Sequence, residues 1–326
     1  MIRLALFSLI LAAGLGQTQP IELPDELSHL NALVSQEKDL LDAARAYDKA
    51  QSLLAEGDLR EAKQLKEAGQ ADESKAKQEQ ASRRFKQIRT AYEFVLQHYP
   101  RNPRAKTYYG EVLYDRFGEF DAAVKNWEEA VVLDPRLATP YNDLGIHYCH
   151  TGEYAKGLRY YDKALELDPE NPDYLFNIVQ TYLTSFPEVQ RYRKWDKPKV
   201  YREAIKLSKK AIKLSPDDFE LARDYAMNFF TAENFGVKAD WKDAGEAWQR
   251  ARALARNDAE RFNAWLNEAR AWTRAENGTK ARACIEEALK IQPGNALAEK
   301  LLADLSSDAP AKKQPAKTNV RQPSSQ

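Results

Sequence analysis

The sequence predicts an all-α protein, a right-handed solenoid built from stacked helical hairpins. Apolar residues recur at spacings of three and four over most of the 326 residues, which is the period of a helix with one buried face. A short pattern of aromatic, leucine and small residues returns at steps of 34 residues or somewhat more. No run alternates Val, Ile or Thr with polar residues, and there are only 13 glycines, so strands are not expected.

The clearest copy of the pattern lies between Tyr141 and Pro169. Eight positions carry it: Tyr141, Leu144, Gly145, Tyr148, Gly157, Tyr161, Ala164 and Pro169. The first helix is expected to end at Gly152, since glycine readily adopts the left-handed cap, and Pro169 ends the second. Gly145 costs helix propensity, so its place indicates that a neighbouring helix comes close there. The resulting hairpin has one apolar side left over and must stack on copies of itself.

This spacing resembles the tetratricopeptide repeat, in which aromatic-x2-Leu-Gly-x2-Tyr is followed by small-x3-aromatic and a closing proline. The repeats and a capping helix are expected at 104–137, 138–171, 172–218, 219–258, 262–295 and 296–305. In the first repeat Gly110 comes one residue before the expected small position, which Glu111 occupies. The resemblance implies a protein that holds partner proteins and rarely does chemistry.

Residues 21–103 precede these repeats and are expected to form a long helical hairpin. A turn is predicted at 56–58, where Gly57 can cap one helix and Asp58 can start the next. Between Lys66 and Arg84 no apolar residue is larger than alanine, so this stretch is expected to be a solvated insertion. The alternative is a protruding helix that touches a partner.

Residues 1–16 have the pattern of a secretory signal peptide, with Arg3 before an apolar run that ends near Leu15. This predicts an exported protein, periplasmic or secreted. The run is shorter than the roughly 20 residues of a membrane-spanning helix, and no other stretch is long and apolar enough to span. An uncleaved anchor is the alternative. Residues 306–326 contain almost no large apolar side chain and are expected to be disordered.

Charge and motifs exclude several classes of function. The 49 basic and 49 acidic residues balance, which argues against a nucleic-acid partner held by bulk charge. No nucleophile motif, phosphate loop or dinucleotide fingerprint is present, so no enzyme activity, catalytic residue or cofactor is predicted. His147, Cys149 and His150 share one helical turn, but no fourth ligand is nearby, so no metal site is predicted.

The resemblance implies a concave groove lined by the first helix of each repeat. The groove residues carried over are Tyr108, Arg116, Asn142, Ile146, Phe176, Asn177, Gln180, Arg223, Met227, Phe230, Arg270 and Arg274, together with Val112, Cys149 and Leu266. Amide side chains suit an extended peptide backbone, and arginine can hold a carboxylate with two hydrogen bonds. The predicted partner is therefore a protein or peptide segment with acidic residues or a C-terminus near the arginines.

A second candidate site is the stretch 185–200, expected to be a long loop. It interleaves Phe186, Tyr192 and Trp195 with five basic residues, a composition that can bind an anionic glycan or lipid head. This leads to the alternative function, a cell-envelope enzyme or glycan-binding accessory protein. In the opposing interpretation Tyr192 and Trp195 pack back on the solenoid.

Overall fold

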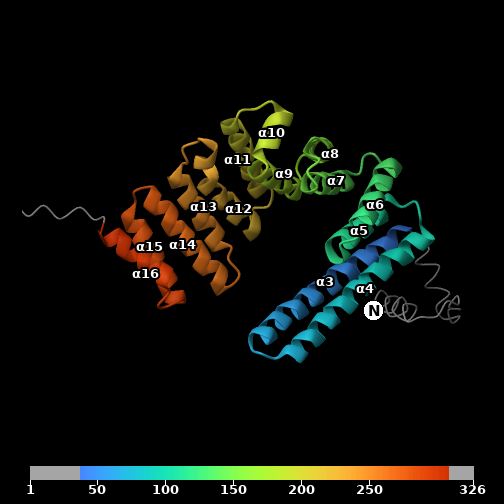
Figure 1. The fold of residues 1–326 in the computed structure, drawn as a ribbon, viewed down its shortest axis with the longest axis horizontal. Helices are drawn as coiled ribbons and strands as arrows, with labels where there is room; N and C mark the ends of the chain where they lie inside the picture. The colour runs from blue at the N-terminus through green and yellow to red at the C-terminus, as the bar shows by residue number, and fades with distance from the viewer. Residues whose placement is uncertain (1–36, 308–326) are drawn as a thin grey trace, which may run out of the picture. The chain divides into compact units, whose positions relative to one another are not determined.

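The computed structural model describes residues 37–307, and every regular element in this range is a helix (Figure 1), which confirms the all-α prediction. The chain forms two compact units, and the first ends at Tyr174 while the second begins at Leu175. The predicted signal peptide and nearly all of the predicted tail lie outside the described residues. Those two predictions therefore stay predictions.

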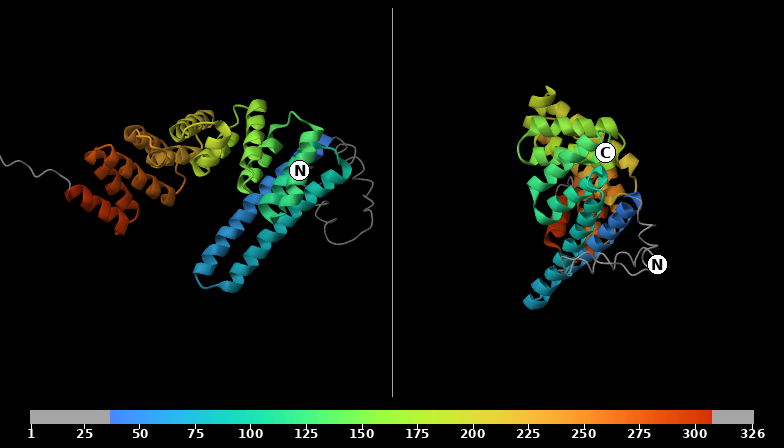
Figure 2. Two further views of the ribbon diagram at one scale, coloured as in Figure 1. Left: turned by 45° about the horizontal axis from the view of Figure 1, so that its top comes forward. Right: turned by 90° about the vertical axis from the view of Figure 1, so that its right-hand side faces the viewer.

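Unit 1 begins with a long antiparallel hairpin of α3 (Glu37–Glu67) and α4 (Ala71–His98), which lie side by side in Figures 1 and 2. The turn predicted at 56–58 is wrong, because α3 continues straight through Gly57. The chain turns instead at Gly69, whose φ of 80° is in the left-handed region that glycine tolerates.

Small side chains line the contact between the two helices within the stretch 66–84, whose residues are otherwise mostly exposed. Ala62 of α3 and Ser74 and Ala81 of α4 are all buried, and the Ser74 hydroxyl donates a hydrogen bond of 2.7 Å to the Ala62 carbonyl. The two helices therefore close on a seam of small residues, where large apolar side chains have no room. Arg84 adds a pair across the seam, with its Nε 2.9 Å from an Asp58 carboxylate oxygen.

The rest of unit 1 consists of helices that pair in sequence order. They are α5 (Pro103–Val112), the π-helix η1 (Leu113–Phe117), α6 (Phe120–Leu133), α7 (Ala138–His150) and α8 (Tyr154–Leu167). A Cβ built on Gly145 of α7 would lie 2.6 Å from the ring of Tyr161 in α8. This confirms that a neighbouring helix requires the glycine.

The π-helix η1 resolves the irregular spacing of the first repeat. A Cβ on Gly110 would lie 2.4 Å from Nε1 of Trp127, so Gly110 makes the close approach that Gly145 makes in the next repeat. The left-handed Gly118 follows Gly110 by eight residues, whereas Gly152 follows Gly145 by seven. A π turn accommodates one extra residue. The small position is thus Gly110 and not Glu111, which corrects the predicted register of α5 by one residue.

Unit 2 continues the series of helices. Its elements are α9 (Pro172–Thr184), which starts in unit 1, α10 (Phe186–Arg193), α11 (Lys197–Leu214), α12 (Phe219–Asn228), the 3-10 helix η2 (Phe229–Phe235), α13 (Trp241–Ala253), α14 (Asp258–Arg274), α15 (Gly278–Ile291) and α16 (Ala296–Ser307). The stretch 185–200 is therefore not a long loop: it contains α10 and the start of α11. Pro187 explains the local helix, since proline fits the first turn where no backbone donor is needed.

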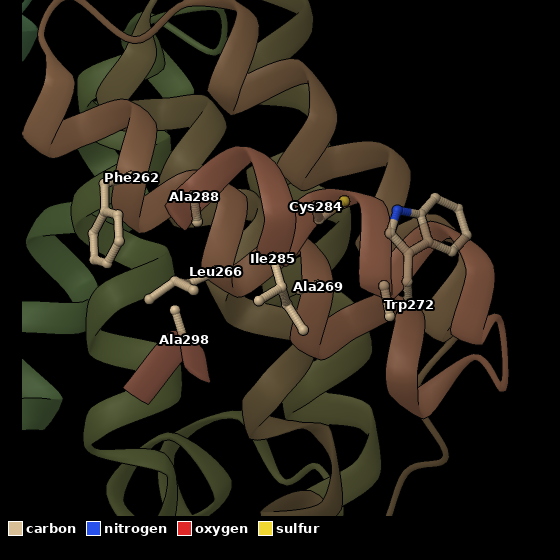
Figure 3. Packing of buried hydrophobic residues seen from close by; sticks show 9 residues of the cluster. Phe262, Leu266, Ala269, Trp272, Cys284, Ile285, Ala288 and Ala298 are labelled. Carbon is tan, nitrogen blue, oxygen red and sulfur yellow. The ribbon is translucent and has the colours of Figure 1, made fainter. Parts of the chain in front are cut away.

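The C-terminal helices of unit 2 enclose one continuous apolar core (Figure 3). Its buried members are Phe262, Leu266, Ala269, Trp272, Ala281, Cys284, Ile285, Ala288 and Ala298. Ala298 belongs to α16, so this last helix covers the end of the α14–α15 hairpin as a capping helix does. Such a cap shields the apolar side that a terminal repeat would otherwise expose.

Candidate functional site

Three of the predicted groove residues meet on one surface of unit 2. The guanidinium carbon of Arg270 lies 4.9 Å from the centre of the Phe230 ring, and that of Arg274 lies 5.8 Å from the same centre. Phe230 comes from η2 and both arginines come from α14, where their spacing of four places them on one helix face. The sequence register for these two repeats therefore brought the right residues together.

Trp241 completes this surface and was not predicted as a site residue. Its ring lies 5.5 Å from that of Phe230, and the guanidinium of Arg274 lies 4.6 Å from its centre. The signal was present in the sequence, since Asp240 caps α13 through hydrogen bonds to two backbone N–H groups and makes Trp241 its first residue. We call Met227, Phe230, Trp241, Arg270 and Arg274 the Arg–aromatic face.

The arginines of this face retain donors for a ligand. Arg270 and Arg274 are both exposed, and Met227 is 40% exposed. Arg270 donates one hydrogen bond of 2.9 Å to the Asn267 side chain, and Arg274 lies 3.8 Å from the carboxylate of Glu233. A guanidinium carries five N–H donors, so each arginine can still bind a carboxylate while its flat side stays on an aromatic ring.

The other predicted residues of unit 2 are engaged with their own chain. Arg223 pairs with Glu220 at 2.6 Å, and Gln180 donates a hydrogen bond of 2.6 Å to Asp224. Phe176 and Asn177 are half-buried on α9. Leu266 is buried in the core shown in Figure 3 and does not line a surface.

In unit 1 the predicted residues do not form an open polar groove. Asn142 is 5% exposed and donates a hydrogen bond to Asp143, while Ile146 is half-buried. Tyr108 lies beneath the guanidinium of Arg45 at 3.8 Å, and Arg116 lies over Phe85 of the long hairpin at 4.8 Å.

Two further positions carried over as groove residues, Val112 and Cys149, are both buried at 5% exposure and belong to the interior of unit 1. The extra residue in η1 explains the error at Val112, because it turns this side chain into the core beside Leu40 and Leu41.

Acidic side chains that sequence reasoning missed gather in unit 1. Asp48, Glu111, Asp115 and Asp143 form what we call the acidic cluster. Burial raises the pKa of Glu111 to about 7, against the opposing effect of Arg45 and with the charges of Asp48 and Asp115 adding to it. Burial and the charge of Glu111 also raise the pKa of Asp143 well above its usual range. The missed signal was the one-residue displacement at Gly110, which places Glu111 rather than Val112 on this side of α5.

The helical turn that carries His147 and Cys149 packs against other side chains of unit 1. The ring of His147 meets that of Tyr114 edge to face, and burial lowers the pKa of its imidazole. Cys149 and Cys284 are both buried thiols. Within residues 37–307 no group of three His, Cys, Asp or Glu side chains is arranged to hold a metal ion.

The aromatic residues around 185–200 pack within unit 2. Trp195 meets the buried Tyr182 edge to face at 5.9 Å, and Phe186 meets the buried Phe235 at 5.1 Å. Three of the five cations of the stretch, Arg193, Lys197 and Lys199, lie over aromatic rings, and Lys197 is 4.5 Å from the centre of the Phe186 ring. For Trp195 this arrangement corresponds to the second interpretation of the stretch, and a glycan-binding platform is not favoured. Among the helices described here, none is long and apolar enough to cross a membrane.

Family models and curated proteins match parts of the chain. Models of the tetratricopeptide repeat match residues 74–138 and 138–171. The photosystem I assembly protein Ycf3 of Rippkaea orientalis is 30% identical over 142 residues, which cover 41% of this chain and 82% of that protein. Human tetratricopeptide repeat protein 6 is 32% identical over 66 residues, which cover 20% of this chain and 13% of that protein.

Solved structures are similar at lower identity. YrrB, titled as a TPR protein with an unusual peptide-binding site, is 20% identical with a TM-score of 0.47, and the match covers 64% of this chain and 96% of that one. The C-terminal part of a TPR repeat-containing protein from Cytophaga hutchinsonii is 17% identical with a TM-score of 0.49, covering 84% and 98%. From the matching repeat models and the relative aligned over most of its length, we conclude that this chain belongs to the tetratricopeptide repeat family.

Proposed function

We propose that this chain is a non-catalytic scaffold that holds a partner protein, and that its Arg–aromatic face binds an extended acidic segment of that partner. The observation that carries the proposal is the stacking of two exposed guanidinium groups on the rings of Phe230 and Trp241. Family membership supports the general role, since these repeats commonly mediate protein–protein contacts.

The physical case rests on preorganisation. An arginine side chain loses rotamer freedom when it binds a ligand, but Arg270 and Arg274 already rest on aromatic rings. Less entropy is then lost on binding, and the planar fork remains available to pair with a carboxylate. Met227, three residues before Phe230, is exposed and can supply a flexible apolar contact for side chains of varied shape. Such a surface favours an acidic residue or a C-terminal carboxylate next to an apolar one.

The test begins with crosslinking in intact cells and mass spectrometry, which identify the partner. Calorimetry then compares the wild type with Arg270→Ala/Arg274→Ala. We expect the partner to bind roughly 10- to 100-fold more weakly, because two charge-assisted hydrogen bonds are removed. The matched control is Arg202→Ala/Arg250→Ala, which removes two exposed arginines from α11 and α13 of the same unit.

The control variant distinguishes binding by these two arginines from a general effect of the protein's net charge. Equal weakening in both double variants would mean that only net charge matters, and unchanged binding in both would move the site away from this face. Retention of a glycan without any polypeptide partner would contradict the scaffold proposal altogether.

The proposal includes export to the cell envelope or the medium, supported by Arg3 and the apolar run that follows it. N-terminal sequencing of the mature protein is expected to find a start between Leu15 and Thr18. Protein that retains Met1 in the cytosolic fraction would contradict export.

A further inference from the structure

The acidic cluster of unit 1 is drawn from four separate segments. Glu111 comes from α5, Asp115 from η1 and Asp143 from α7, and the long hairpin adds Asp48 from α3. Each of Glu111, Asp115 and Asp143 has its pKa raised, by burial first and, for Glu111 and Asp143, by neighbouring acids as well.

Two arginines of the chain partly compensate this charge. Arg45 of α3 lies 3.6 Å from a carboxylate oxygen of Glu111 and 3.5 Å from one of Asp48. The second nearby arginine, Arg116, is directed to Glu56 at 3.4 Å. Arg116 also lowers the pKa of Asp115, so within the described range two guanidinium groups, one of them paired with Glu56 as well, oppose four carboxyl groups. The cluster therefore keeps an excess of acidic groups that can bind a further positive charge.

Asp143 gives independent support, because its buried side chain lacks a partner on one oxygen. The residue is 8% exposed, and its Oδ1 accepts a hydrogen bond of 3.2 Å from Asn142, whereas its Oδ2 has no hydrogen-bond partner among the described residues. A buried polar atom left unpaired destabilises a fold by about 1–3 kcal/mol, more when the group is charged. The helix α7, which carries Asp143, contacts α5, which carries Glu111, and the charges of Glu111 and Asp115 raise the pKa of Asp143.

We propose that the acidic cluster is a second binding site, which receives the ammonium or guanidinium group of a lysine or arginine side chain from a protein partner. Glu111, with its side chain 29% exposed, and the exposed Asp115 are the carboxylates that an incoming cation meets first. Asp143 is the buried carboxylate whose negative charge the cation stabilises after contact. The residues of this site all belong to unit 1, and none of them belongs to the Arg–aromatic face.

The proposal predicts binding that strengthens as pH rises. A carboxyl with a pKa of about 7 is largely protonated at pH 6 and largely ionised at pH 8, and only the ionised form attracts a cation. Besides the four acids themselves, the charged and titratable groups that interact with the cluster are Arg45, Tyr92, Tyr108, Tyr114, Arg116 and Tyr174.

The experiment uses a phage-displayed library of 12-residue peptides, selected on the full chain at pH 8 and depleted on the Glu111→Gln/Asp143→Asn variant. We expect the surviving peptides to be enriched in lysine and arginine. Synthetic copies of these peptides should bind Glu111→Gln/Asp143→Asn at least 10-fold more weakly than they bind the wild type. Their affinity for the wild type should also be at least 10-fold weaker at pH 6 than at pH 8. Circular dichroism verifies that the variant is folded.

The matched control is Asp72→Asn/Glu79→Gln, which removes two exposed carboxylates from α4 in the same unit. The selected peptides should bind this control, and Arg270→Ala/Arg274→Ala, as they bind the wild type. The proposal is overturned if no peptide survives depletion or if the surviving peptides lack lysine and arginine. It is also overturned if the α4 control variant binds the peptides as weakly as Glu111→Gln/Asp143→Asn does. None of these outcomes affects the proposed role of the Arg–aromatic face.

Discussion

Asp143 of unit 1 and Glu268 of unit 2 are both buried carboxylates, but their surroundings differ. Glu268 is 4% exposed, and both of its oxygens accept hydrogen bonds, one from Arg252 at 2.8 Å and one from the Trp272 indole at 3.3 Å. Asp143 is 8% exposed, and within the described part of the chain it has no arginine or lysine bound to it and has one unpaired oxygen.

The difference shows what a structural acid looks like in this fold. A buried charge is tolerated when a partner cation and hydrogen bonds replace its hydration, as they do at Glu268. Asp143 receives only the Asn142 amide among the described residues, and its acidic neighbours oppose its ionisation. A group kept in so costly a place is a good candidate for a functional role, whereas Glu268 is explained by packing.

The largest effect on stability is expected from removing Arg252, the cation that pairs with the buried Glu268. Arg252→Met leaves Glu268 buried without its cation and should lower the free energy of unfolding by about 2–3 kcal/mol, at the lower end for such changes because Arg252 is partly exposed. Urea denaturation measures this loss. The double variant Arg252→Met/Glu268→Met should recover most of the stability, and a single variant as stable as the wild type would show that the pair is not structural.

A substitution at Gly110 tests the corrected register of α5, which places Glu111 on the side of the acidic cluster. Gly110→Ala should destabilise the protein by about 1–3 kcal/mol, because the new Cβ meets the buried Trp127 indole, which donates a hydrogen bond to the Thr107 carbonyl. Gly57→Ala is the matched control, since no described atom outside its own helix lies within 4 Å of its Cβ, and it should stabilise α3 by about 0.5–1 kcal/mol. Equal melting temperatures for the two variants would contradict the corrected register.

Neutralising the uncompensated acid should stabilise unit 1. Asp143→Asn is expected to raise the free energy of unfolding at pH 8 by about 1 kcal/mol or more, since the buried carboxylate no longer has to be ionised or protonated against its solution preference. The corresponding amide substitution in unit 2, Glu268→Gln, should instead lower the free energy of unfolding. A loss of stability in Asp143→Asn would show that the carboxylate has a stabilising partner in solution.

Glu111 gives this comparison a pH dependence. Its folded pKa of about 7 exceeds the ordinary value of 4.5, so between these values the folded state binds more protons than the unfolded state. Raising the pH through this window therefore lowers the stability contributed by Glu111. Thermal melts of Glu111→Gln should lose this part of the wild-type pH dependence, and an unchanged profile would place the titration elsewhere.

The smallest effect is expected on the Arg–aromatic face. Arg270→Lys/Arg274→Lys should change the free energy of unfolding by no more than about 0.5 kcal/mol, because exposed charges contribute little to stability. Partner binding should nevertheless weaken, since lysine keeps the charge but loses the planar stacked fork. A large stability loss would mean that these arginines serve the fold rather than a ligand.

The sequence by itself determined the all-α class and the hairpins that follow the repeat pattern, and it predicted part of one site. The helical period and the paired glycine and aromatic positions are local, so the spacing of Gly145 and Tyr161 alone is enough to predict their helices and the close approach between them. Arg270 and Arg274 could be predicted because α14 is uninterrupted and keeps the register of its repeat, and Phe230 could be predicted because it is only the second residue of η2, directly after α12.

Only the tertiary structure decided the features that depend on a shifted register or on neighbours distant in sequence. A single π turn at Leu113–Phe117 moved Glu111 to a different side of α5, and a local pattern cannot show such a turn. The hairpin turn lies at Gly69 because alanine and serine fit the seam between α3 and α4, which concerns packing across two helices. Whether a buried acid such as Asp143 or Glu268 has a cation beside it likewise depends on helices distant in sequence, because charge compensation is a property of three-dimensional contacts.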